Sequence, residues 1–176
     1  GRYDDAEKMA LLITQEFPEH QFSWKILGAI YKALGRMTDA LGAGTKAVEL
    51  DPGDNEAHNN LGSTLQGLGR LAEAEASYRQ AIALKPNYAE AYSNLGIILQ
   101  ELGRLEEAEA CYRQAIALKS DDAEAHYNLG VMLQGLGRLA EAAEQLTLGE
   151  TDISKAYLLK CFYRLDQQSN FYDQLD

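Results

Sequence analysis

The sequence predicts an all-α protein, an α-solenoid of antiparallel helix pairs that repeat with a 34-residue period. Two observations carry this prediction. Residues 69–96 match residues 103–130 almost letter for letter, at a displacement of 34 positions. Within each unit, apolar residues follow helical spacing on both sides of a Leu-Gly-Arg break, which ends one helix and begins the next. A self-similar period of this length is typical of a stacked repeat array.

Glycines mark the frame of the repeat at two places. A Leu-Gly pair recurs in the first helix of each unit, where a small residue lets two antiparallel helices approach closely, and a second glycine follows seven residues later. We expect this second glycine to adopt a positive φ that stops the first helix and reverses the chain. The first set is Gly28, Gly62, Gly96 and Gly130, and the second is Gly35, Gly69, Gly103 and Gly137.

This frame divides the chain into six segments. Residues 1–20 are expected to form the second helix of a truncated repeat, because Gly1 and Pro18 fall where Gly35 and Pro52 fall. The frame thus starts within a repeat, and we expect the chain to be a fragment of a larger protein. The expected repeats are 21–54, 55–88, 89–122 and 123–150, the last with a divergent second helix, and 151–176 is a C-terminal capping helix and the start of a linker.

The capping helix is expected to pack on the last repeat through one apolar face. Its spacing suggests that the inner residues are Ala156, Leu159, Phe162 and Tyr163. Such a cap covers the apolar side of a terminal repeat, which has no further neighbour.

The residues of the first repeat resemble a known family. The segment WKILGAIYKALGRMTDALGAGTKAVELDP (24–52) carries the W-x2-L-G-x2-Y, Ala, Ala and Pro pattern of the tetratricopeptide repeat. The resemblance covers residues 1 to about 150. It implies a right-handed superhelix whose first helices line a concave wall, and a function in protein binding.

Gly44 departs from this pattern. It stands in the aromatic position that Tyr78 and Tyr112 occupy in the next two repeats. Two explanations remain open: a neighbouring large residue such as Phe22 fills the gap, or the repeat has degenerated.

Composition and motifs argue against several function classes. A net charge of −11 opposes binding to nucleic acid and to anionic membranes, and no apolar run is long enough to span a bilayer. Two cysteines without a disulfide framework, and the lack of a signal peptide, favour the cytoplasm. The three histidines are scattered, and His58 and His126 share a packing position with Trp24 and Tyr92. We therefore expect no metal site, no cofactor and no enzymatic activity in this chain.

Polar residues on the first helices are the candidate binding site. Asn60, Asn94 and Asn128 recur before the Leu-Gly pair; we call them the asparagine row. The glutamate row lies four residues earlier and the glutamine row six residues later: Glu56, Glu90 and Glu124, and Gln66, Gln100 and Gln134. An Asn amide offers a donor and an acceptor, so it can hold the backbone of an extended peptide. The alternative is that the asparagines bond locally and brace adjacent helices.

Two family comparisons refine this hypothesis. The asparagine row resembles that of the tetratricopeptide arrays of O-linked N-acetylglucosamine transferases, where such residues hold protein substrates. The carboxylate clamp of chaperone-binding members is matched only by Lys25 and Asn60, whereas Ala29, Glu90 and Asn94 depart from it. We therefore do not expect an acidic chaperone tail to bind.

The predicted function is a non-catalytic scaffold that binds an extended peptide or a partner helix in its concave groove. The alternative is a self-assembly module that forms homo-oligomers through its terminal helices, where Met9, Leu12 and Ile13 are apolar.

Overall fold

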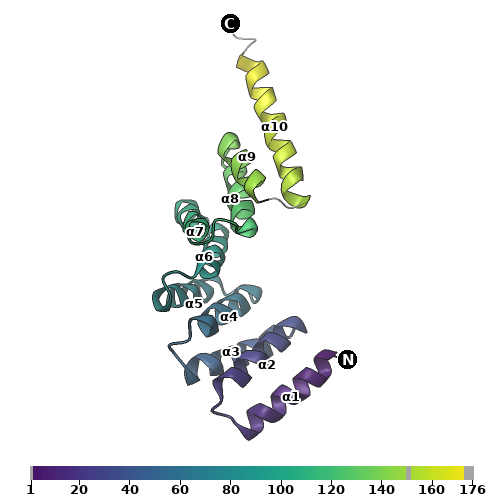
Figure 1. Ribbon diagram of the computed structural model, residues 1–176, viewed down its shortest axis with the longest axis vertical. Coiled ribbons are helices and arrows are strands. Elements are labelled where there is room, and N and C mark those ends of the chain that lie inside the picture. The colour runs from purple at the N-terminus through teal and green to yellow at the C-terminus, as the bar shows by residue number, and fades with distance from the viewer. Residues whose placement is uncertain (1, 150–151, 173–176) are drawn as a thin grey trace. The chain divides into compact units, whose positions relative to one another are not determined.

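The computed structural model describes residues 2–149 and 152–172, and every regular element in these ranges is a helix (Figure 1). Helix α1 precedes a series of helix pairs, and a long final helix follows them. Their bounds are α1 (Arg2–Glu16), α2 (Gln21–Ala33) with α3 (Met37–Leu50), α4 (Asn55–Gly67) with α5 (Leu71–Leu84), α6 (Ala89–Glu101) with α7 (Leu105–Leu118), α8 (Ala123–Gly135) with α9 (Leu139–Leu148), and α10 (Asp152–Tyr172).

The all-α helical-repeat solenoid predicted from the sequence is confirmed. The chain forms two compact units, Gly1–Ile98 and Leu99–Asp176, with the division inside α6. In the first unit α1 contacts α2, α2 contacts α3, α3 contacts α4, and α4 contacts α5. In the second unit α7 contacts α8, α8 contacts α9, and α9 contacts α10. The assignment of these helices to the repeat ranges given above remains a prediction.

The helix pairs turn at the predicted glycines. Gly35, Gly69, Gly103 and Gly137 have φ between 71° and 78°, whereas no other described residue has a positive φ. At the first turn the Arg36 amide donates to the carbonyl of Tyr31, and the Gly35 amide donates to that of Lys32. These two bonds close the end of α2 in the manner of a Schellman motif. The expected positive φ at Gly69 is thus confirmed.

The N-terminal ends of two first helices are capped by aspartate. The carboxylate of Asp54 accepts hydrogen bonds from the amides of Glu56 and Ala57 at 2.8 and 3.1 Å. Asp122 accepts a bond from the Ala125 amide at the start of α8. A side-chain oxygen at this position satisfies amides that have no partner inside the helix.

The position shared by Trp24, His58 and His126 has a structural use. The ring N–H of Trp24 donates to the carbonyl of Pro18, and Nε2 of His58 bonds the carbonyl of Pro52. Nε2 of His126 bonds the carbonyl of Ser120 in the same way, and its side chain is buried. In each case the acceptor lies six residues earlier, so a ring N–H ties the inter-repeat loop to the following helix.

The prediction of which residues form the inner face of the capping helix α10 is wrong. Leu159, Phe162 and Tyr163 are 54–72% exposed, and Ala156 is also exposed. The buried residues are Ser154 and Cys161, with Tyr157 half-buried between them. These small side chains allow α10 to lie close to α9 and to Gln134 of α8, whose amide donates to the Cys161 sulfur. The prediction failed because it ranked residues by apolar size.

Candidate peptide-binding site

The three members of the asparagine row have different surroundings. Asn60 on α4 is exposed. Asn94 on α6 is half-buried, and its Nδ2 donates to Oδ1 of Asn59 at 3.1 Å. Asn128 on α8 is half-buried, and its Nδ2 has no hydrogen-bond partner among the described residues. Asn60 therefore carries an exposed amide, Asn128 carries a buried amide nitrogen without a partner, and Asn94 takes part in a local brace.

Asn59 is the centre of that brace, although it is not among the residues predicted from the sequence. Its side chain is only 2% exposed, and its Nδ2 donates to Oε1 of Glu90 at 3.0 Å while its Oδ1 accepts from Asn94. Tyr88 lies beside this group, and burial followed by the charge of Glu90 raises its pKa to about 12. The Asn-Asn doublet before Leu61 is the sequence signal that could have revealed this residue.

The three members of the glutamate row also differ in their contacts. Glu90 accepts from Asn59, and Glu56 accepts from Nζ of Lys25 at 2.9 Å, whereas Glu124 lies exposed in the first turn of α8. Only the first two belong to polar networks that join different helices of the first unit.

The glutamine row is largely occupied by contacts within the protein. Oε1 of Gln66 accepts from the Tyr78 hydroxyl at 3.3 Å, and Oε1 of Gln100 accepts from that of Tyr112 at 3.1 Å. Gln134 is 9% exposed and donates to the carbonyl of Tyr157. Through these contacts the three side chains orient two buried tyrosines or hold α10.

Lys25 and Asp54 form an ion pair in the first unit whose two side chains are both largely shielded from solvent. Their Nζ and Oδ2 atoms lie 2.7 Å apart, and Gln21 donates to the same oxygen at 2.6 Å. Burial opposes the charge of Asp54, but the bonds from Lys25, Gln21 and the Ala57 amide lower its pKa to about 2. The network joins α2 to the start of α4, so it fixes the two first helices that carry Lys25 and Asn60.

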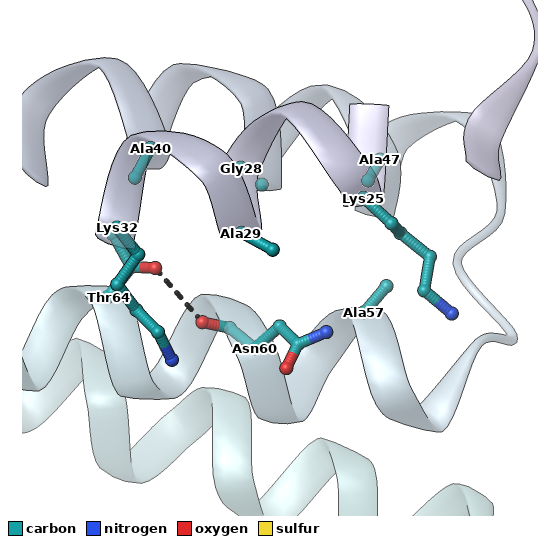
Figure 2. A pocket seen from close by; sticks show the side chains of 10 residues that line it. Lys25, Gly28, Ala29, Lys32, Ala40, Ala47, Ala57, Asn60 and Thr64 are labelled. Carbon is teal, nitrogen blue, oxygen red and sulfur yellow. Dashed lines mark hydrogen bonds between the residues drawn. The ribbon is translucent and has the colours of Figure 1, made fainter. Parts of the chain in front are cut away.

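A small pocket lies between α2, α3 and α4, and Asn60 stands at its rim (Figure 2). Its volume is about 40 Å³, and its walls include Gly28 and Gly44. Figure 2 shows Lys25, Ala29 and Lys32 projecting from α2, with the Asn60 amide opposite Ala29. Phe22 does not fill the gap at Gly44, because its side chain is 59% exposed and does not line the pocket.

Two other kinds of feature are missing from the described ranges. No group of three or more His, Cys, Asp or Glu side chains is arranged there to hold a metal ion. No helix in these ranges is long and apolar enough to cross a membrane.

Comparison with family models identifies the chain. One model described as tetratricopeptide repeat matches residues 1–55 and 94–149, and a second with the same description matches residues 54–121. Because the first of these models covers more than half of the sequence, the chain belongs to the tetratricopeptide repeat family. A comparison with curated proteins found no significant match.

Solved structures agree with this assignment. The chain is similar to the crystal structure of MamA, with 25% identity over 94% of this chain and 91% of that one and a TM-score of 0.77. It is also similar to the first tetratricopeptide domain of Spaghetti (RPAP3) bound to an HSP90 peptide, with 30% identity over 66% of this chain and 93% of that one and a TM-score of 0.64.

A third neighbour supports the fold alone. The thermophilic tetratricopeptide protein TTC0263 from Thermus thermophilus shares 24% identity over 93% of this chain and 92% of that one, with a TM-score of 0.74. Together the family and its neighbours support a protein-interaction scaffold. The resemblance to the arrays of O-linked N-acetylglucosamine transferases remains a prediction.

Proposed function

We propose that the chain is a non-catalytic scaffold that binds an extended peptide along the first helices of its repeats. The observation that carries the proposal is the exposed amide of Asn60, which lies beside the pocket between α2 and α4. An unpaired amide can accept from a peptide N–H and donate to a peptide carbonyl at the same time.

Under this proposal the members of the asparagine row have different roles. Asn60 contacts the peptide in the first unit, whereas Nδ2 of Asn128 in the second unit is buried and closed to a peptide. Asn94 acts with Asn59 and Glu90 as a brace that holds α4 and α6 at a fixed spacing. Both roles of the asparagines, ligand contact and local brace, therefore apply, but to different members of the row.

The test uses peptides selected from a random phage-displayed library against the intact chain. Asn60→Ala should weaken the binding of such peptides about tenfold, in line with the loss of charge-neutral hydrogen bonds in a desolvated site. Its urea midpoint should stay unchanged, because the side chain is exposed.

Gln80→Ala on α5 is the control, because it also removes an exposed amide but lies outside the proposed site, and it should leave the binding of the selected peptides unchanged. The proposal fails if Asn60→Ala binds the peptides as tightly as the parent chain and Gln80→Ala do.

Self-association is a second candidate, favoured by apolar side chains on the terminal helices. Met9 and Leu12 on α1 are 62% and 61% exposed, and Leu159 on α10 is 72% exposed. Exposed apolar residues grouped on a helix are candidates for burial in an interface. Light scattering over a range of concentrations tests this: self-association predicts a mass that rises with concentration and falls in Leu12→Glu or Leu159→Glu, whereas a constant monomer mass excludes it.

A further inference from the structure

The pocket beside Asn60 exists because the first repeat lacks the ring that fills the same space in the next one. In the second repeat a Cβ built on Gly62 would lie 2.8 Å from Cε1 of Tyr78, so the ring covers the glycine. In the first repeat Gly44 takes the place of Tyr78. A Cβ on Gly28, the counterpart of Gly62, would meet nothing closer than 3.7 Å.

The size of the pocket selects its occupant. A volume of about 40 Å³ has room for about three water molecules, but it is far below the roughly 150 Å³ of an apolar cavity that binds benzene. Its inner wall is made of Gly28, Ala40, Gly44, Ala47 and Ala57, which present no polar side chain. Leu61, whose Cδ1 would lie 3.5 Å from a Cβ built on Gly44, narrows the space left by the missing ring, so that it suits one aliphatic side chain of leucine size.

The lysines at the rim of the pocket determine which peptide residue can bind next to the aliphatic side chain. Lys25 is neutralised by Asp54 and Glu56, whose oxygens lie 2.7 and 2.9 Å from its Nζ. Lys32 instead donates to the hydroxyl of Ser63 at 3.0 Å, and no carboxylate among the described residues forms an ion pair with it. In the frame of the repeat Lys32 takes the place of Gln66, the partner of the Tyr78 hydroxyl. Its positive charge is therefore available to an acidic ligand.

We propose that this pocket holds a leucine-sized aliphatic side chain of the bound peptide, and that Lys32 pairs with a carboxylate two residues away along the same peptide. The spacing of two follows from an extended chain, in which residues i and i+2 point to the same side. The inference rests on the proposed function and adds to it the chemical class of the ligand, an acidic peptide with an aliphatic anchor. Asn60 at the rim would hold the peptide backbone between the two side chains (Figure 2).

The probe is the peptide acetyl-Asp-Ala-Leu-Ala-Asp-amide, titrated into the intact chain and followed by amide NMR up to about 10 mM, where weak fragments of this size are detected. We expect shifts centred on the amides of Gly28, Gly44 and Ala57. Replacing Leu by Ala in the peptide should weaken binding about tenfold, because the aliphatic burial is lost. Replacing both Asp by Asn should weaken it about threefold, and Lys32→Met should cancel that difference.

A filled pocket provides the matched pair of variants. Gly44→Leu places the aliphatic group inside the chain and should abolish the shifts. Gly42→Leu on the same helix should leave them unchanged, because Gly42 is exposed and a Cβ there meets nothing within 4 Å. If Gly44→Leu fails to fold, the comparison of the Leu and Ala peptides on the parent chain still decides the question.

The pocket inference is overturned if no shift appears at these amides, or if the Leu and Ala peptides bind equally. Its failure differs from that of the proposed function. Phage-selected peptides that depend on Asn60 but bind Gly44→Leu unchanged would refute the pocket and keep the scaffold. Peptides that depend on Gly44 but not on Asn60 would keep the pocket and refute the role of the amide.

Discussion

The ring of Tyr78 lies directly over Gly62: a Cβ built on the glycine would approach Cε1, Cδ1 and Cζ of the ring to 2.8–3.0 Å. Tyr78 is fully buried, and its hydroxyl is fixed by Gln66. The glycine of the Leu-Gly pair is therefore required by the aromatic ring of the same helix pair. Where that ring is missing, in the first repeat, the structure has the pocket instead.

Gly62→Ala should destabilise the first unit. The new methyl group would overlap a ring that cannot move, and the expected net loss is about 1–2 kcal/mol despite a gain in helix propensity of about 1 kcal/mol. Urea unfolding followed by circular dichroism measures the change. Gly42→Ala is the control, since it has free space and should gain about 0.5–1 kcal/mol; equal midpoints for the two variants would refute the overlap.

Gly69→Ala should also destabilise the protein, through the backbone. Gly69 has a φ of 71°, a conformation that costs a residue with a Cβ about 1–2 kcal/mol. The control is Gly135→Ala, because Gly135 has a negative φ and open space around it. The expected order of urea midpoints is Gly135→Ala at or above the parent chain, and Gly69→Ala below it.

Stability should fall in acid partly because of Asp54. Its folded-state pKa is about 2, below the usual value near 3.8, so its contribution is present above pH 4 and is lost as the pH falls towards 2. Asp54→Asn keeps an N-cap side chain but removes the charge. It should therefore lower the urea midpoint of unfolding at pH 6, and it should reduce the fall of that midpoint between pH 4 and pH 2. If the urea midpoints of the parent chain and the variant fall by the same amount between pH 4 and pH 2, Asp54 does not have this role.

Asn59 and Asn60 should behave oppositely although they are adjacent. Asn59→Ala leaves Nδ2 of Asn94 and the Glu90 carboxylate without their partner, and we expect a loss of about 1–3 kcal/mol. Asn60→Ala should change stability by less than about 0.5 kcal/mol, because the side chain is exposed. Thermal unfolding of the two variants gives the comparison, and a loss at Asn60 as large as that at Asn59 would count against the assignment of roles.

The helix pairs and their turns could be predicted because the relevant residues repeat. Gly69 and Gly103 recur in one frame, and only glycine readily adopts the φ that a reversal at this point requires. The roles of Asn60 and Asn94 could not be separated in this way. They share one place in the repeat, and what distinguishes them is the neighbour: Asn94 finds Asn59, whereas Asn60 faces the pocket.

The pocket and the face of α10 show the same limit. Gly44 shows in the sequence that the first repeat lacks the aromatic residue of the pattern. Whether neighbouring side chains then fill the vacated space depends on the packing around Gly44. At α10 the contact is made by Ser154 and Cys161, two side chains that apolar periodicity does not rank as core. Departures from the repeat depend on shape complementarity between particular side chains, which a periodic pattern does not contain.

The most direct test of the scaffold proposal is an N-methyl scan of a peptide selected against the chain. Methylating one or two backbone nitrogens should weaken binding to the parent chain about tenfold with every side chain retained, and the same methylation should have no further effect in Asn60→Ala. Equal binding of the methylated and unmethylated peptides to the parent chain would contradict the claim that Asn60 recognises the peptide backbone.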